Sequence, residues 1–403
     1  MPSALPVGLS WPDNFVLQPL TIAEKSFHAY VHIPFCTVRC GYCDFNTYAP
    51  KETDADQATF DQALITEIKR SEKFLEQSGL KVPALKSVFV GGGTPSLLTS
   101  KQFASILSEL RQTFGFADDI EITTEANPES TTTEVLAELR KLGVNRLSLG
   151  VQSFDTEVLR VLDRTHTEQK VFELVPQALE LGFEVSVDLI YGAPGETLNS
   201  WKSTVKKALE LGTQHISAYS LIVEPGTKLE RKIRRGELES IDEDLNAAKH
   251  EYASQSFEEA GLVWYEVSNW GKPSVHNSAY WQSQNWWGYG PGAHSHLFGN
   301  RFWNVKNPTA YQQKLENGLA VAGREELTSR QQLEEQLMLG VRTSGGVSRE
   351  LFGELGIPGH LVASAIAAGL LVTDAKSVRV TSNGRLLVDR LVVDFLSPSE
   401  EIV

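Results

Sequence analysis

The sequence predicts an α/β protein whose first half is a partial barrel of six parallel strands alternating with helices, a partial (β/α)6 barrel. Short apolar segments rich in β-branched residues alternate with segments of helical periodicity, which end at glycines such as Gly79 and Gly143. Strands separated by helices pair in parallel. A barrel is favoured over a doubly wound sheet because glycine or polar residues follow five consecutive strands, at what would be one mouth.

The predicted strands are residues 29–34, 86–91, 119–126, 145–151, 183–192 and 214–222. Between the first two, Phe60, Leu64 and Ile68 recur on one face of a predicted helix. Thr131 and Glu134 predict a capping box at the start of a later helix. The sequence ALELG occurs at 178–182 and again at 208–212, as repeated βα units would produce.

After about residue 235 the alternation stops. A charged amphipathic helix is followed by an aromatic-rich and glycine-rich segment that contains HNSAYW at 276–281. Further helices, then a β-ribbon and a last helix, predict a small α+β C-terminal domain that is winged-helix-like. We therefore expect an N-terminal arm (1–25), the barrel (26–235), a connecting region (236–307) and the C-terminal domain (308–403).

Composition excludes several classes of protein. The net charge of −14 argues against nucleic acid as the main partner, so we expect the C-terminal domain to serve packing. The sequence contains no run of 18 apolar residues, so we expect no transmembrane helix. The first 24 residues contain four prolines and no Lys or Arg, unlike a secretory signal. Three cysteines cannot all pair within one chain, which favours the cytoplasm.

All three cysteines, Cys36, Cys40 and Cys43, follow the first predicted strand within eight positions. A four-iron cluster held at three corners would leave one iron open to a ligand. Zinc would need a fourth ligand, for which His32 is the nearest histidine. Reactive or structural thiols are the third possibility. Soft thiolates favour the first two.

The other strand ends carry groups that suit a small ligand. Gly91, Gly92 and Gly93 follow the second strand and allow close approach of a backbone. Glu125, Asn127, Gln152 and Asp188 stand at or near the ends of the next three strands. Together they predict a ligand at the barrel mouth.

The three cysteines in this spacing, with Tyr42 before the last one and a following Gly-Gly motif, resemble the radical S-adenosylmethionine (SAM) family. The resemblance implies a 4Fe-4S cluster whose open iron binds the amino and carboxylate groups of SAM. It implies that Gly92, Gly93 and Thr94 contact the methionine part and that Glu125 binds the ribose.

Seven blocks, among them YVHIPFC, GGGTPSLL and VDLIYGAPGE, resemble the oxygen-independent coproporphyrinogen III oxidase group over residues 28 to 395. This implies that Tyr30, Gln152, Arg164 and Asp188 contact SAM. Two other interpretations stay open: Tyr30 could cap the barrel, and Arg164 could pair with a carboxylate.

Two features differ from the oxidase pattern, which has a fourth cysteine where this chain has Phe45 and a longer N-terminal extension. Phe45 and HNSAYW are similar to the heme chaperone (HemW) subgroup. That resemblance implies heme binding and transfer to an acceptor protein, with membrane-associated proteins among the candidates. Oxidative decarboxylation of coproporphyrinogen III is the alternative, so whether the chain is an enzyme stays open.

The HNSAYW segment suits heme chemically. Imidazole is a common axial ligand of heme iron, which makes His276 the candidate, with His294 and His296 as rivals. Tyr280 and nearby tryptophans offer flat faces for a porphyrin. Arg301 and Lys306 are candidates for the propionates. Alternatively, these aromatics close the open side of the barrel and His276 bonds to a backbone group.

Overall fold

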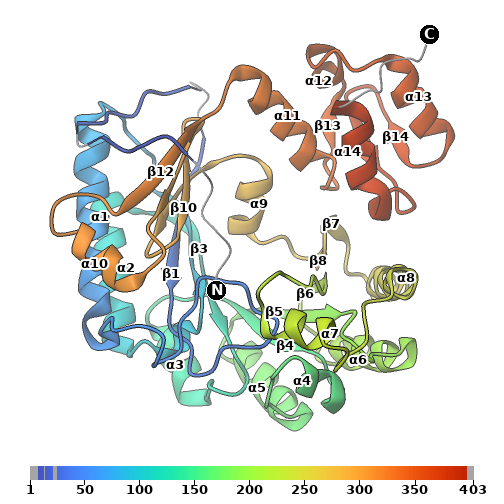
Figure 1. The fold of residues 1–403 in the computed structure, drawn as a ribbon, viewed down its shortest axis with the longest axis horizontal. Coiled ribbons are helices and arrows are strands. Elements are labelled where there is room, and N and C mark those ends of the chain that lie inside the picture. Colours follow the sequence, from blue (N-terminus) through green and yellow to red (C-terminus); the bar gives the residue numbers. More distant parts are fainter. Residues whose placement is uncertain (1–7, 13, 21–24, 397–403) are drawn as a thin grey trace.

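The computed structural model describes residues 8–12, 14–20 and 25–396. Its main sheet has the strand order β12-β11-β10-β9-β1-β2-β3-β4-β5-β6-β8-β7 (Figure 1). The predicted parallel strands form its centre, namely β1 (Phe27–Ile33), β2 (Leu85–Gly92), β3 (Phe116–Ala126), β4 (Arg146–Gln152), β5 (Glu184–Tyr191) and β6 (His215–Ser220). They are neighbours in chain order, so the doubly wound alternative is wrong.

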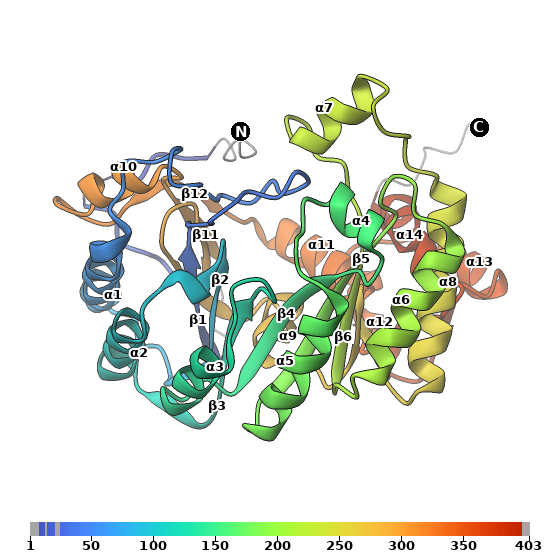
Figure 2. The same cartoon turned by 90° about the horizontal axis from the view of Figure 1, so that it is seen from below.

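Helices connect these strands, as the sequence predicts. Figure 2 shows several of them around the outside of the strands. Leu64 and Ile68, predicted for the inner face of the first helix, are fully buried. The connecting helices are α1 (Phe60–Gln77), α2 (Ser100–Phe114), α3 (Thr133–Lys141), α4 (Thr156–Val161), α5 (Glu168–Glu180) and α6 (Leu198–Glu210), with the short 3-10 helices η1 (Gln57–Thr59) and η2 (Pro95–Leu97).

The aromatic-rich segment extends the sheet on both sides. On one side β9 (Asn285–Tyr289) pairs in parallel with β1, and β10 (His294–Leu297), β11 (Asn300–Asn304) and β12 (Val321–Glu326) continue antiparallel. On the other side β8 (Asn269–Gly271) and β7 (Trp264–Glu266) follow β6. The sheet therefore continues past residue 308, where the sequence suggests a boundary. The helices of this part are α7 (Lys228–Arg234), α8 (Glu243–Glu259), α9 (Val275–Trp281) and α10 (Pro308–Lys314).

The C-terminal part has its own small antiparallel sheet of β13 (Val347–Ser348), β15 (Ser377–Val380) and β14 (Leu371–Thr373). The predicted β-ribbon is β14 and β15, and the predicted last helix is α14 (Val388–Leu396). The remaining helices are α11 (Ser329–Gly340), α12 (Arg349–Glu354), α13 (Gly359–Ala367) and η3 (Arg385–Leu387).

Three local details complete the comparison with the sequence. The predicted capping box of Thr131 and Glu134 is wrong: Thr132 caps α3 by accepting from Val135 N, and the valine at that position cannot complete a box. Thr131 Oγ1 instead donates to the Asn127 carbonyl. The expected arm, 1–25, lies partly outside the described residues, but its Leu17 is fully buried. Within the described ranges, none of the helices has both the length and the apolar character that crossing a bilayer requires.

Candidate functional site

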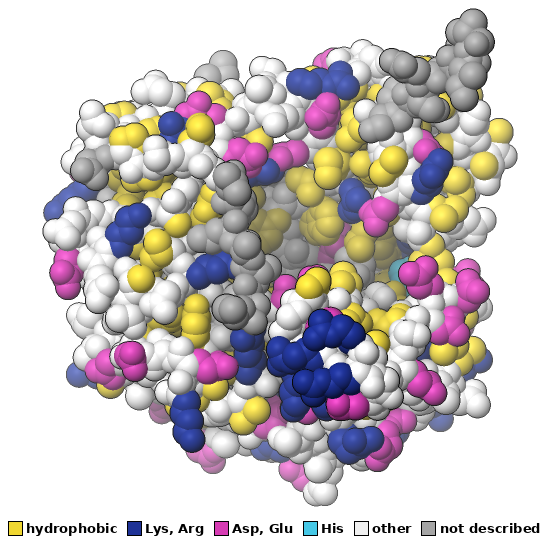
Figure 3. All heavy atoms as spheres, in the orientation of Figure 1, with side chains coloured by type: hydrophobic (Ala, Val, Ile, Leu, Met, Phe, Trp, Pro, Cys, Tyr) yellow, Lys and Arg dark blue, Asp and Glu magenta, His cyan; other side chains and the backbone are white. Residues whose placement is uncertain are grey.

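The ends of the parallel strands surround a cavity of about 560 Å³, which we call the strand-end pocket. The three cysteines, Tyr42, His276 and the eight residues that the resemblance assigns to SAM all line it, whereas Gly91 does not. Figure 3 shows a hollow near the middle of this face, with hydrophobic side chains inside it. Strand order explains this convergence, because parallel strands place all their carboxyl ends at one edge of the sheet.

The cysteines lie in the loop 34–48 after β1, which we call the cysteine loop. Backbone hydrogen bonds shape it: Cys36 N donates to Tyr48 O (3.0 Å), and Cys43 N donates to Cys40 O (3.2 Å). All three thiols are half-buried and none forms a disulfide. The loop therefore presents three thiols to one pocket.

Neighbouring groups decide how readily these thiols ionise. Burial raises the pKa of all three, that of Cys43 to about 11. Thr94 Oγ1 donates to Cys36 Sγ (3.8 Å) and lowers the pKa of that thiol. The buried Thr47 hydroxyl lowers the pKa of both Cys36 and Cys43. The charge of Arg164 acts on Cys40 in the same direction. These groups favour the thiolate form that binds metal.

The glycine-rich loop after β2 packs directly on the cysteine loop. Gly93 N donates to Ile33 O (2.7 Å), and Thr94 N donates to Phe35 O (2.8 Å). A Cβ on Gly93 would lie 2.4 Å from Phe35 O, and Gly92 has a φ of 109°, which favours glycine. Larger residues here would push the two loops apart.

Two carboxyl groups lie in the pocket. Glu125 accepts from Gly92 N (2.8 Å), and burial, with a smaller contribution from the charge of Asp188, raises its pKa to about 7. Burial also raises the pKa of Asp188, although three serine hydroxyls donate to its carboxylate. These donors are Ser148 (2.5 Å), Ser186 (3.0 Å) and Ser217 (2.8 Å). Asp188 is therefore held rigidly, whereas Glu125 can still accept hydroxyl groups of a ligand.

Arg164 is held by the protein itself. Its guanidinium forms an ion pair with Glu129 (2.7 Å) and donates to Asn127 Oδ1 (3.0 Å) and Gly150 O (2.9 Å). The carboxylate partner that the sequence leaves open for Arg164 is thus present. The nearby Gln152 adopts a left-handed backbone with a φ of 63°. Such strain in a non-glycine residue is typical of functional sites.

The two predicted tyrosines have different surroundings. Tyr30 OH is hydrogen-bonded to His32 Nδ1 (2.9 Å), and its ring stacks on Phe89 with centroids 6.1 Å apart. Tyr42 packs against a small apolar cluster that contains Leu229 of α7. Both hydroxyls are buried, which raises their pKa values.

His276 lies on α9 and lines the pocket, where it contacts Ser87 of β2. Its ring is 2% exposed and is hydrogen-bonded at both nitrogens, Nδ1 to Ser87 Oγ (2.7 Å) and Nε2 to Tyr280 OH (2.8 Å). Burial lowers its pKa well below the usual value, so the ring is neutral. An iron atom could reach Nε2 only if the Tyr280 ring moved away.

The other histidines and cations that the sequence suggests for heme lie elsewhere. His294 and His296 belong to β10 and do not line the strand-end pocket. His296 Nδ1 is hydrogen-bonded to Gln284 O (2.9 Å). Arg301 pairs with Glu325 and Glu335 and, like Lys306, does not line the pocket.

Comparison with known proteins agrees with this geometry. Residues 30–208 match the model of the radical SAM superfamily. The chain is 42% identical to the heme chaperone HemW of Mycobacterium tuberculosis, over 91% of this chain and 94% of that one. The chain belongs to the HemW family. It is also 34% identical to HemW of Bacillus subtilis (91% and 98% covered) and 33% to the mitochondrial radical S-adenosyl methionine domain-containing protein 1 of Bos taurus (92% and 88%).

A solved structure is also similar. Coproporphyrinogen III oxidase (HemN) from Escherichia coli, a radical SAM enzyme, has a TM-score of 0.78 and 26% identity, covering 93% of this chain and 91% of that one. The mixed α/β fold with its parallel sheet therefore matches that of a radical SAM enzyme. Membership of the superfamily implies a 4Fe-4S cluster and SAM.

The residues of the strand-end pocket fit a 4Fe-4S cluster and SAM. No three His, Cys, Asp or Glu side chains in the described part of the chain converge to hold a single metal ion. A four-iron cluster makes a different demand, because each thiolate binds a separate iron. The cysteine loop offers three half-buried thiols with hydroxyl donors beside Cys36. The glycine-rich loop and Glu125 lie next to them, as a nucleotide bound at the cluster requires.

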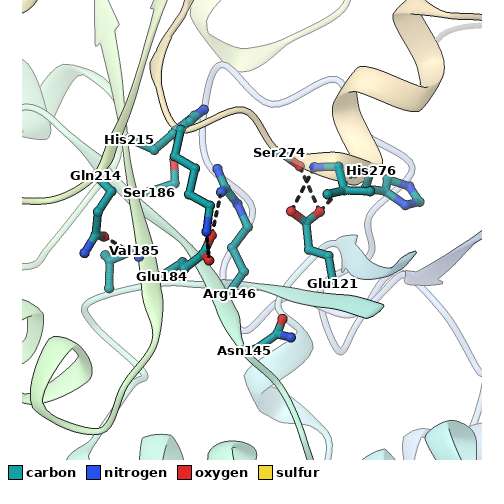
Figure 4. A network of polar contacts seen from close by, with 12 residues as sticks. Glu121, Asn145, Arg146, Glu184, Val185, Ser186, Gln214, His215, Ser274 and His276 are labelled. Carbon is teal, nitrogen blue, oxygen red and sulfur yellow. Dashed lines mark hydrogen bonds and ion pairs between the residues drawn. The ribbon is translucent and has the colours of Figure 1, made fainter. Parts of the chain in front are cut away.

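Several residues that shape the pocket escape prediction from sequence. Glu121 on β3 accepts from Ser274 Oγ (3.1 Å), Val275 N (2.8 Å) and His276 N (2.9 Å), and so fixes the start of α9 (Figure 4). Arg146 also lies deep in the pocket and pairs with Glu184 (3.6 Å) (Figure 4). Both are buried charged residues on strands. The alternation of side chains within DIEITTEA and NRLSLGV indicates that Glu121 and Arg146 face inward. It does not indicate which residues they pair with.

Proposed function

We propose that this chain is a heme chaperone that binds a 4Fe-4S cluster, SAM and heme, and that transfers heme to an acceptor protein. The observation that carries the proposal is the 42% identity to a HemW protein over 91% of the chain. Phe45, where the oxidase pattern has a fourth cysteine, supports it. We further propose that β1–β6 are the family's partial (β/α)6 barrel, that the C-terminal part is winged-helix-like, and that the protein acts in the cytoplasm.

Each pocket residue then has a distinct role. Cys36, Cys40 and Cys43 hold the cluster. When bound there, the cluster would supply an open iron for SAM and an electron. The backbone of Gly92, Gly93 and Thr94 positions the methionine part of SAM. Glu125 accepts hydrogen bonds from the ribose hydroxyls, which its location beside Gly92 N supports. Tyr30, Tyr42, Gln152, Arg164 and Asp188 complete the walls around the nucleotide.

Anaerobic reconstitution with iron and sulfide tests the cluster. Wild-type protein should bind about four irons and absorb broadly in the visible range. The Cys36→Ala/Cys40→Ala/Cys43→Ala variant should bind none, because it lacks every cysteine of the chain. Stoichiometric zinc without iron in the wild type would instead support a zinc-stabilised scaffold.

Heme titration tests the chaperone function. Wild-type protein should give a Soret band, and His276→Ala should shift or weaken it if Nε2 binds the iron. An unchanged band in His276→Ala would remove that residue from the site. Absence of any heme binding by the wild type would refute the chaperone function.

Coproporphyrinogen III oxidation is the second candidate, because the TM-score to the Escherichia coli enzyme is 0.78. Reduced protein, SAM and coproporphyrinogen III are incubated without oxygen, with that enzyme as the positive control. We expect no protoporphyrinogen. Its formation at a comparable rate would show that the chain is the oxidase.

A further inference from the structure

A basic segment stands out in this acidic chain. The net charge is −14, yet five of the eight residues 228–235 are Lys or Arg. They belong to α7 and to Arg235 directly after it, which we call the basic helix. Figure 3 shows dark blue side chains gathered at the position that α7 has in Figure 1, beside the central hollow.

The carboxylates around the basic helix leave part of its charge unpaired. Lys228 pairs with Asp163 (2.8 Å), Arg234 with Glu230 (3.2 Å) and Arg235 with Glu237 (3.7 Å). Arg231 is exposed and donates to a carbonyl, Gly226 O (3.0 Å), not to a carboxylate. Among the described residues Lys232 has no ion-pair partner. Two cationic groups are therefore available to an external anion.

The basic helix is fixed beside the cysteine loop. Leu229 N donates to Gly41 O (2.8 Å), and Gly41 lies between Cys40 and Cys43. The Leu229 side chain is 1% exposed and packs in the same apolar cluster as Tyr42. Figure 2 shows α7 and the cysteine loop at the same end of the strands. α7 is thus held at the rim of the strand-end pocket, next to the cysteine loop that lines it, although none of residues 228–235 lines the pocket itself.

Large apolar side chains are exposed on the same rim. Val38 (69% exposed) and Phe45 (59%) project from the cysteine loop. Ile222 (68%) and Tyr219 (43%) come from the end of β6 and the segment after it. All four line the strand-end pocket. An exposed apolar group of this kind at the mouth of a pocket indicates a binding surface.

We propose that this rim is where heme docks, with its propionate carboxylates on Arg231 and Lys232 and its apolar ring against Val38, Phe45, Tyr219 and Ile222. The inference rests on the proposed heme-binding function and adds the location of the propionates. Heme combines a flat apolar ring with two carboxylates on one edge, and the rim combines apolar side chains with cations on one side. The assignment does not depend on which residue binds the iron.

The test compares heme with its dimethyl ester, which lacks both propionate charges, by Soret titration in the same detergent. The variant is Arg231→Glu/Lys232→Glu. Its matched control, Lys101→Glu/Lys141→Glu, makes the same change in net charge on α2 and α3, at exposed positions. A neutral variant, Arg231→Gln/Lys232→Gln, guards against a folding defect in the charge reversal.

We expect the charge reversal to weaken heme binding roughly tenfold and the neutral variant about threefold, as for exposed charge pairs. Binding of the ester should change less than about twofold in all variants. Added salt should weaken binding of heme to the wild type but not binding of the ester, because only heme carries the propionate charges. The control should bind heme like the wild type.

Three results would overturn the inference: equal heme affinity in wild type and charge reversal, an equal loss for heme and ester, or an equal loss in the control. In each case the wild type still binds heme, so the proposed function stands and only the location fails. A wild type that binds neither heme nor ester refutes the proposed function itself, and the location with it.

Discussion

Glu121 makes a sharp prediction about how α9 is held in the pocket. The first N–H groups of a helix lack partners within the helix. Here the Glu121 carboxylate supplies acceptors for two of them, Val275 N (2.8 Å) and His276 N (2.9 Å), and also for Ser274 Oγ (3.1 Å) (Figure 4). Glu121→Ala removes all three bonds while leaving the strand intact.

The size of the effect follows from burial. An unsatisfied buried N–H costs roughly 1–3 kcal/mol. His276 is 2% exposed and should be near the upper end, whereas Val275 is half-buried, where water can partly replace the carboxylate. Loss of a negative charge at the helix start adds about 0.3–1 kcal/mol. We therefore expect the free energy of locally opening α9 to fall by about 4 kcal/mol.

Hydrogen exchange measures this opening directly, because local unfolding exposes amides without global unfolding. A loss of about 4 kcal/mol corresponds to roughly 1,000-fold faster exchange of the Val275 and His276 amides. Asp119→Ala is the control, since Asp119 lies on the same strand with a side chain 72% exposed. If both amides keep their wild-type protection in Glu121→Ala, the carboxylate does not hold α9 and the reasoning is wrong.

Three further predictions concern single groups. Lys249→Met should lower the free energy of unfolding by about 3–5 kcal/mol in urea, because it leaves the Glu196 carboxylate (2.9 Å away, fully buried) without its cation. Lys249→Met/Glu196→Gln should recover most of that loss, and an equal loss in the double variant would contradict the explanation. Since the pKa of Glu125 is raised to about 7, SAM affinity should rise from pH 6 to pH 8 as the carboxylate ionises. Calorimetry should find that rise absent in Glu125→Gln, and a flat wild-type profile would exclude this role. Tyr280→Phe removes the hydrogen bond to His276 Nε2, so heme affinity should increase roughly two- to tenfold if that nitrogen binds iron. An unchanged Soret titration would show that Nε2 is not the ligand.

Some features of the pocket could be predicted from sequence because they depend on local patterns. Strand ends are marked by a change from β-branched residues to glycine or polar ones, and this change predicts Gly93, Glu125 and Asp188 as site residues. Parallel pairing then follows from the intervening helices, and it brings those ends together whatever the details of packing. The cysteine cluster can be predicted for the same reason, since the spacing of its residues is local.

The state of each side chain could not be predicted, because it depends on partners far away in the chain. His276 and Ser87 are 189 positions apart, yet their hydrogen bond helps determine whether the imidazole is available. The same holds for Glu121, whose partners on α9 are more than 150 positions away. Sequence patterns record which residues face inward, but they do not record which strand or helix they meet.

The sequence by itself determined the strand and helix order, the cluster of thiols and the family. Local periodicity and short-range spacing are enough for these. Only the tertiary structure decided that Arg164 is paired with Glu129, that His276 is bonded at both nitrogens, and that α7 stands beside the cysteine loop. The physical reason is that hydrogen bonding and burial are set by contacts between distant segments, and these form only when the chain is folded.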